Sequence, residues 1–204
     1  MDNKFKLLVD YFGKLRFKFD EPLKDHTLLK IGGPAKLFFI AFTTRELAKI
    51  AQMAYELKIP ILVFTMGSKI AISEEGFGGL VVKNRTQLIN IVGIKGKVNK
   101  ALIGVDEALI KVDTGVSIAK LIEFLDKNSM QSVEFSGLPG SIGGNLFISR
   151  LVQNKLQSIE VVENGKVEKI SANELKLSQH VILSCILRVK PIAALSVSAM
   201  GAKI

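Results

Sequence analysis

Cysteine is nearly absent from this sequence, which has only Cys185 among its 204 residues. The chain therefore has no internal disulfide, and this cysteine, inside the apolar run 181–187, is expected to be a small core residue. No group of potential ligands has a spacing typical of zinc sites, so no metal is expected.

Long apolar runs are also missing, because no stretch approaches the roughly 20 residues that a membrane-spanning helix needs. Between residues 4 and 18, lysines and an arginine are interleaved with apolar residues, which is unlike a signal peptide. We therefore expect a cytoplasmic protein without a membrane partner.

Aromatic residues make up only 7% of the sequence, and tryptophan is absent. The net charge is +9, and most of the lysines are scattered singly, as on a solvated surface. Because there is no aromatic-rich basic platform, nucleic-acid binding is not expected. A basic surface suits an anionic nucleotide ligand equally well.

The apolar residues, 48% of the chain, are sufficient for a substantial core in one large domain or two small ones. Thr43 and Glu46 form a capping-box signature for a helix that runs to about residue 57, and a buried strand follows at 61–64. A strand, a helix and a strand in this order indicate α/β structure. Other expected elements are an amphipathic helix over 1–16, short antiparallel strands over 89–112 with turns at Gly93, Gly96 and Gly104, a helix capped by Ser117, a hairpin at Asn164-Gly165 and a strand over 181–189.

The stretch 137–144 is rich in glycine, with four glycines and one proline in eight residues. Glycine permits positive φ and lets a ligand approach the main chain closely. Successive N–H groups of such a stretch can form an anion-binding nest, and a helix starting at Ser141 would add its positive end. A second small-residue turn, Gly67-Ser68, follows an apolar strand. Together the two stretches predict a site for a phosphate-bearing ligand. His26 has no visible catalytic partner and is expected to be a structural or surface histidine.

Four stretches of this sequence resemble the UDP-N-acetylenolpyruvoylglucosamine reductase (UDP-N-acetylmuramate dehydrogenase) family. They are residues 26–35, Gly67-Ser68 with 73–82, 138–144, and 158–165 with 181–183. The match at 138–144 is the most specific, and the similarity extends over roughly residues 18–190.

The resemblance implies an α+β (α/β) chain with the two-subdomain FAD-binding fold of the UDP-N-acetylmuramate dehydrogenase and PCMH type. The expected division is an N-terminal helix at 1–19, FAD-binding subdomains at 20–83 and 84–190, and a tail at 191–204. The family's C-terminal substrate domain, with its catalytic glutamate, is absent from this sequence, which suggests a truncated member.

The resemblance also implies a cofactor and a reaction. FAD would lie between the subdomains, NADPH would reduce it, and a UDP-sugar with an enolpyruvyl group would accept the hydride in peptidoglycan precursor synthesis. The residues implied to bind FAD are Gly67, Ser68 and Lys69 at the pyrophosphate, and Leu138, Pro139, Gly140, Ser141, Gly143 and Gly144 at the flavin side.

The sequence departs from the family pattern at the phosphate loop, where Thr65 and Met66 replace glycines and Lys69 replaces an asparagine. Met66 would be strained if its position required positive φ, whereas Lys69 can compensate as a cation. The family's Tyr-Arg-x-Ser segment, which supplies a catalytic arginine and serine, is replaced by residues 176–180. Ser178 and His180 are conceivable substitutes, but no spacing supports them, so no catalytic residue is assigned.

Three functional hypotheses follow. The chain is an FAD-binding relative of the reductases with impaired catalysis, or a working reductase whose missing parts come from a partner chain. Alternatively, it is a non-catalytic scaffold or interaction protein that retains the fold, with or without FAD. Protein partners are not identified by the sequence.

Overall fold

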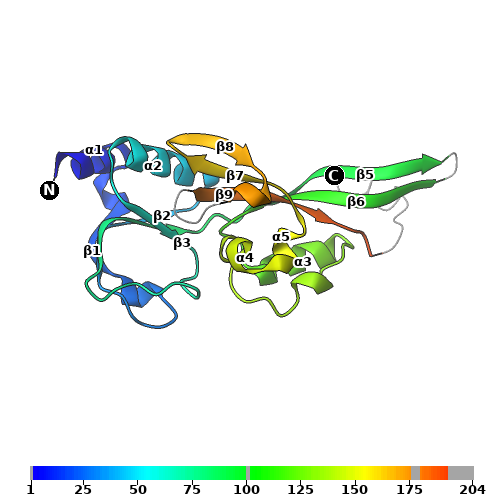
Figure 1. Ribbon diagram of the computed structural model, residues 1–204, viewed down its shortest axis with the longest axis horizontal. Helices are drawn as coiled ribbons and strands as arrows, with labels where there is room; N and C mark the ends of the chain where they lie inside the picture. Colours follow the sequence, from blue (N-terminus) through cyan, green and yellow to red (C-terminus); the bar gives the residue numbers. More distant parts are fainter. Residues whose placement is uncertain (1, 100–101, 176–179, 193–204) are drawn as a thin grey trace.

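A computed structural model of the chain describes residues 2–99, 102–175 and 180–192, which form two β-sheets flanked by helices (Figure 1). The first sheet has the strand order β1 (Phe17–Pro22), β2 (Pro34–Ala41), β4 (Phe77–Asn84) and β3 (Ile61–Phe64). The second has the order β5 (Ile89–Asn99), β6 (Leu102–Asp113), β9 (Val181–Val189), β7 (Leu156–Glu163) and β8 (Lys166–Ile170). Strands β2, β4 and β3 are parallel, whereas the second sheet is antiparallel throughout. The predicted mixed α+β class is confirmed.

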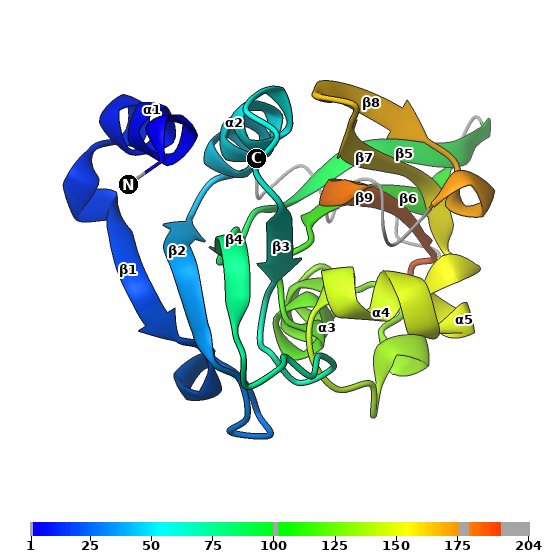
Figure 2. The same ribbon diagram turned by 60° about the vertical axis from the view of Figure 1, so that its left-hand side comes forward.

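The helices form two groups, one for each sheet (Figure 2). Helices α1 (Asn3–Phe12) and α2 (Thr44–Glu56) share an apolar core with the first sheet. Helices α3 (Ile118–Lys127), α4 (Ile142–Ile148) and α5 (Arg150–Gln153) pack against one face of the second sheet. Val162 and Leu183 of the second sheet also belong to the core around α2, so this helix joins the two halves of the molecule.

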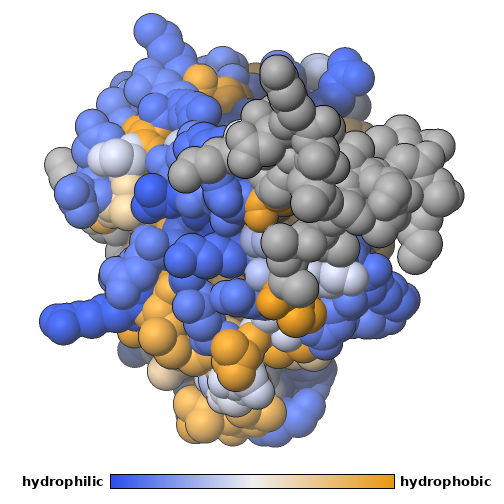
Figure 3. Space-filling model, turned by 90° about the vertical axis from the view of Figure 1, so that its right-hand side faces the viewer, coloured by the Kyte–Doolittle hydropathy of each residue, from blue (hydrophilic) through white to orange (hydrophobic). Residues whose placement is uncertain are grey.

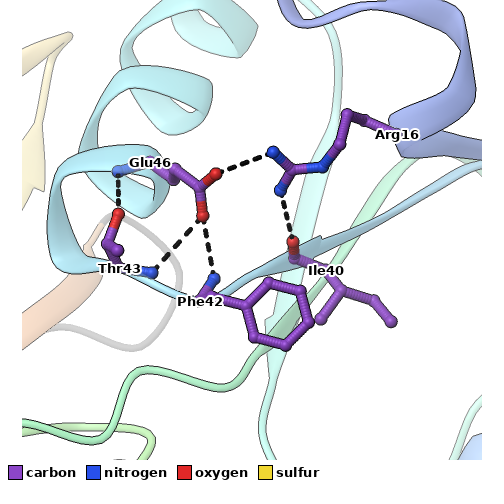
Figure 4. A network of polar contacts seen from close by, with 5 residues as sticks. All are labelled: Arg16, Ile40, Phe42, Thr43 and Glu46. Atoms are coloured by element: carbon purple, nitrogen blue, oxygen red, sulfur yellow. Dashed lines mark hydrogen bonds and ion pairs between the residues drawn. The ribbon is translucent and has the colours of Figure 1, made fainter.

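Helix α2 begins where the sequence predicts, and its first turn is held by a reciprocal network (Figure 4). The backbone N–H of Glu46 donates to Thr43 Oγ1 at 3.1 Å, and Glu46 Oε2 accepts from the backbone N–H of Phe42 at 3.0 Å. Arg16 donates to Glu46 Oε1 at 2.8 Å. The capping box satisfies N–H groups that a helix start leaves unpaired, and the arginine ties it to the segment before β1.

Replacing Glu46 with glutamine is expected to make the protein less sensitive to acid. Burial acts to raise the pKa of Glu46, but the hydrogen bonds from Arg16 and the backbone outweigh it and hold this pKa below its ordinary value of 4.5. The stabilisation is therefore complete above that value and is lost as pH falls through the lowered pKa. Urea unfolding of wild type and Glu46→Gln at pH 7 and pH 3.5 would test this. An equal loss of stability on acidification in both proteins would contradict it.

The region 89–112 differs from its prediction as a set of short strands with turns at glycines. It forms the two long strands β5 and β6, whose hairpin projects from the body of the molecule (Figure 1). Gly93 and Gly96 lie at register shifts within β5, and Gly104 lies inside β6 opposite Lys97. Glycine inside a strand marks a bulge as readily as a turn, and sequence alone does not separate the two.

Most of the other predicted elements are confirmed, with different limits at the N-terminus. Ser117 caps α3, and Asn164-Gly165, with φ of 49° and 74°, joins β7 to β8. Helix α1 is shorter than predicted because Gly13, at φ 89°, ends it. The domain limits stay a prediction, although the chain passes from one sheet to the other between β4 and β5. Of the predicted tail, residues 193–204 lie outside the described part.

Cys185 is buried in the core, as expected, and burial with the nearby charge of Asp113 raises the pKa of its thiol to about 12. Among the described residues, no helix is both long and apolar enough to span a membrane. The same part of the chain contains no cluster of three or more side chains suited to a metal ion.

Candidate binding pocket between the two sheets

A pocket of about 460 Å³ lies between edge strand β3 and the N-terminal end of α4, a volume typical of small-molecule sites. Its lining includes all of β3, the following segment 65–70, residues of α4, and the start of β9. Among the described residues that line it there is no aspartate or glutamate, and Lys69 is the charged one. The pocket is therefore suited to an anionic or neutral ligand.

Buried polar side chains join the two sheets behind this pocket. Asn84, at the end of β4, donates through Nδ2 to Thr114 Oγ1 at 2.9 Å. Thr114 Oγ1 in turn contacts the carbonyl oxygen of Ile182 at 2.8 Å. Asn84, Thr114 and Ile182 all belong to the lining of the pocket. Because these buried groups satisfy one another, they fix the distance between the two sheets.

The loop after β3 forms one wall of the pocket and rests on the predicted motif at residues 26–35. Gly67 adopts φ 66°, and its carbonyl oxygen accepts from the N–H of Leu28 at 3.0 Å. Met66 does not take positive φ, so the strain considered for it does not arise. The left-handed residue of this loop is the glycine that the sequence retains, which is why the loss of glycine at Met66 is tolerated.

The backbone N–H groups of Met66, Gly67, Ser68 and Lys69 donate no hydrogen bond to other described residues. These four consecutive residues line the pocket. Backbone N–H groups usually find a partner, so a run of open donors at a pocket wall is suited to a ligand with several acceptor oxygens.

The opposite wall, at the start of α4, has the predicted helix cap, and the first backbone donors of the helix are used inside the protein. Ser141 Oγ accepts from the N–H of Gly144 at 3.3 Å. The N–H of Ile142 donates to Val116 O at 2.8 Å, and that of Gly143 to Thr114 O at 3.0 Å. Internal acceptors therefore occupy these three donors, which are not open to an anion, and an anion-binding nest over 137–144 stays a prediction.

The glycines of this wall instead keep the pocket open and let the chain segments approach. Gly143 packs on Thr114, where an added Cβ would lie 3.1 Å from the Thr114 carbonyl oxygen. At Gly144 an added Cβ would lie 3.4 Å from Cδ of Lys69. Side chains at these positions would occupy space between the two walls.

The structure brings together most of the residues predicted to bind a cofactor. The predicted residues in the pocket lining are Gly67, Ser68, Lys69, Ser141, Gly143 and Gly144. Leu138, Pro139 and Gly140 lie outside the lining. Leu138 packs against the core of the second half, and Gly140 lies against the loop, with Ser68 Oγ 3.3 Å from the position of an added Cβ.

The two histidines of the chain, His26 and His180, lie in different environments. His26 is structural, as expected, because Nε2 lies 2.8 Å from Glu21 Oε1 and the ring stacks on Phe38. His180 lines the pocket, and its Nε2 lies 3.1 Å from Glu163 Oε1. Ser178, the other conceivable substitute for a catalytic residue, lies outside the described residues.

The roles of Asn84, Thr114 and Asn145 could not be predicted from the sequence. Each is a buried polar residue, and the first two line the pocket. A buried asparagine or threonine leaves no periodic or motif signal of its own.

An apolar surface adjoins the pocket on the side of helices α4 and α5. Ile148, which lines the pocket, is 65% exposed, and Leu151 is 51% exposed. Figure 3 shows hydrophobic residues gathered on the lower half of the face that includes these helices. The pocket therefore adjoins apolar surface at Ile148.

Comparisons with known proteins agree with the resemblance seen in the sequence. The family model described as "FAD binding domain" matches residues 35–150. The UDP-N-acetylenolpyruvoylglucosamine reductase of Syntrophomonas wolfei is 27% identical over 177 residues, which is 83% of this chain and 55% of that protein. The reductase of the same name from Desulforamulus reducens is 32% identical over 166 residues, or 78% of this chain and 51% of that protein.

The crystal structure of the corresponding reductase from Thermus caldophilus has the same fold, with a TM-score of 0.61 at 19% identity. The similarity covers 85% of this chain and 62% of that one. This chain spans about half the length of the curated relatives it matches. The chain therefore belongs to the FAD binding domain family and is a divergent member of the UDP-N-acetylenolpyruvoylglucosamine reductase family.

Proposed function

We propose that the pocket binds FAD and that this chain carries the flavin part of a UDP-N-acetylenolpyruvoylglucosamine reductase-like reaction. The observation that carries the proposal is the wall of open backbone donors at Met66–Lys69 in a chain of the FAD binding domain family. In this proposal the N–H groups of Gly67, Ser68 and Lys69 hold the pyrophosphate. The glycine-rich segment 138–144 is proposed to border the flavin side.

The pocket fits such a cofactor in its chemistry. Open N–H donors and a lysine offer hydrogen bonds and positive charge to phosphate oxygens, and no carboxylate among the described lining residues opposes them. The walls from β3 and α4 supply apolar contacts through Phe64 and Phe147. When bound, FAD would supply hydride transfer between NADPH and the enolpyruvyl group of the UDP-sugar. Both of these substrates are part of the proposal, as is a cytoplasmic location.

Catalysis is proposed to be impaired in this chain. The sequence at 176–180 contains no arginine and no counterpart of the family's Tyr-Arg-x-Ser segment, so no residue here is assigned to stabilise or protonate the reduced substrate. Groups of that kind each contribute orders of magnitude to a rate. An arginine and a proton donor supplied by a partner chain would restore the reaction, and that arrangement is the working-reductase alternative.

A scaffold that has lost the cofactor is the second candidate, and the start of α4 favours it. The N–H groups of Ile142, Gly143 and Gly144 are all used inside the protein, so these three donors are not open to a flavin. Such a protein would retain the fold as an interaction module and would not bind FAD.

The visible absorption spectrum distinguishes these candidates. The purified protein should retain a flavin band after FAD is added and excess cofactor is removed. NADPH should then bleach the band, and the enolpyruvyl UDP-sugar should restore it slowly or only with a partner chain. A protein that stays colourless under these conditions would overturn the proposal in favour of the scaffold. Bovine serum albumin treated in the same way controls for flavin that adheres without a site.

A further inference from the structure

We propose that Lys69 and Asn145 form a latch across the pocket, in which Asn145 positions the lysine ammonium to bind a diphosphate group. The inference rests on the proposed function and extends it, because it assigns a charge-based contact to a side chain of this particular chain. Lys69 is the residue that binds in this latch, and Asn145 is a positioning residue.

Asn145 is held in one orientation by hydrogen bonds on both sides of its amide. Its Nδ2 donates to the carbonyl oxygens of Pro139 at 2.9 Å and Ser141 at 2.8 Å. Its Oδ1 accepts from Lys69 Nζ at 2.8 Å. The residue is 1% exposed, so water does not compete for these groups. Two carbonyl acceptors allow only the NH₂ end to face them, and the amide oxygen must therefore face Lys69.

The ammonium of Lys69 has three N–H donors, and the contact with Asn145 uses one of them. No carboxylate of the described residues lies within ion-pair distance of it. Partial burial lowers the pKa of Lys69, although much of the side chain is exposed at the pocket. A cation that loses solvation without gaining an internal counterion is suited to an external anion.

The latch also places this cation next to the open backbone donors. Lys69 continues the run of N–H groups from Met66 to Ser68 that have no partner among described residues. Its side chain passes over Gly144, where an added Cβ would lie 3.4 Å from the lysine Cδ. The ammonium is thereby held across the gap between the loop and α4. A diphosphate at the loop would meet backbone donors and this fixed cation together.

Replacing Lys69 with methionine should weaken binding of FAD and of ADP about tenfold at low salt, as expected for loss of one charge-assisted hydrogen bond. Riboflavin, which lacks the diphosphate, should bind wild type and variant equally. Raising NaCl from 50 to 300 mM should weaken the wild type more than the variant, because salt screens the lysine. Calorimetric titration of wild type, Lys69→Met and Lys69→Arg would measure this, and arginine should retain most of the affinity. Lys6→Met, an equal charge change on α1, is the matched control and should bind like wild type.

The role of Asn145 is tested by Asn145→Leu, which removes the amide oxygen that contacts Lys69 Nζ without adding a charge. Binding of ADP should fall about tenfold in the wild-type background and little in the Lys69→Met background. Thermal unfolding of each variant checks the fold, because leucine cannot donate to the carbonyl oxygens of Pro139 and Ser141. If wild type and Lys69→Met bind ADP equally well, the proposed role of Lys69 and Asn145 is overturned. The proposed function still stands in that case if the wild type binds FAD. If the wild type binds ADP through Lys69 but does not bind FAD, the proposed function is overturned and the role of Lys69 stands. A wild type that binds neither ligand would overturn both proposals.

Discussion

Gly67→Ala is expected to abolish stable FAD binding and to lower the free energy of unfolding by about 3 kcal/mol. An added Cβ would lie 2.2 Å from the carbonyl oxygen of His26 and 2.9 Å from Cα of Thr27. Both atoms belong to the backbone, so no side-chain rotation relieves the overlap. The residue also has φ 66°, which an alanine adopts only at a cost. The loop must therefore move away from residues 26–27, and its open donors move with it.

Two further glycine variants separate the overlap from the backbone strain. Gly137→Ala has φ 78° but no atom within 4 Å of the added Cβ, so it should cost about 1 kcal/mol from conformation alone. Gly78→Ala has neither feature and should change stability by less than about 0.5 kcal/mol. Thermal unfolding and retention of FAD would be measured for all three. Similar behaviour of Gly67→Ala and Gly137→Ala would show that the contact with residues 26–27 is unimportant.

Asp113→Ala is expected to lower the free energy of unfolding by about 2–4 kcal/mol. Asp113 is 3% exposed and accepts from Thr44 Oγ1 at 2.9 Å and from the N–H of Leu88 at 3.0 Å. Thr44 begins α2, whereas Asp113 ends β6, so this carboxylate joins the helix of the first half to the second sheet. Removing it leaves two donors without their acceptor at the junction behind the pocket.

Asp106→Ala is a matched control for this variant, because Asp106 lies on the same strand and is exposed. It should change stability by less than about 0.5 kcal/mol. Urea unfolding of both variants measures the difference. FAD binding by Asp113→Ala should also weaken, because Thr114, the next residue, lines the pocket. Equal stability of the two variants would show that the carboxylate is not needed at the junction.

Local interactions explain the elements that could be predicted from the sequence. The capping box of Thr43 and Glu46 joins groups three residues apart, and the turn at Asn164-Gly165 needs only positive φ at two adjacent residues. Both signals lie within a few consecutive residues, so the surrounding fold does not alter them. The prediction of turns at Gly93 and Gly96 is wrong, because both glycines lie at register shifts within β5. A bulge and a turn use the same residue type, and only the pairing with β6 decides between them.

The sequence by itself determined the fold class, the family, the caps and the glycine at position 67, because each depends on neighbouring residues or on a motif. Tertiary structure decided which backbone donors stay open, since the N–H groups of residues 66–69 find no acceptor in the described part of the chain while those of residues 142–144 do. It also decided the contact between Lys69 and Asn145, which are 76 residues apart. A hydrogen bond of this kind exists only when packing brings two distant segments within 3 Å, and no local pattern in the chain encodes that distance.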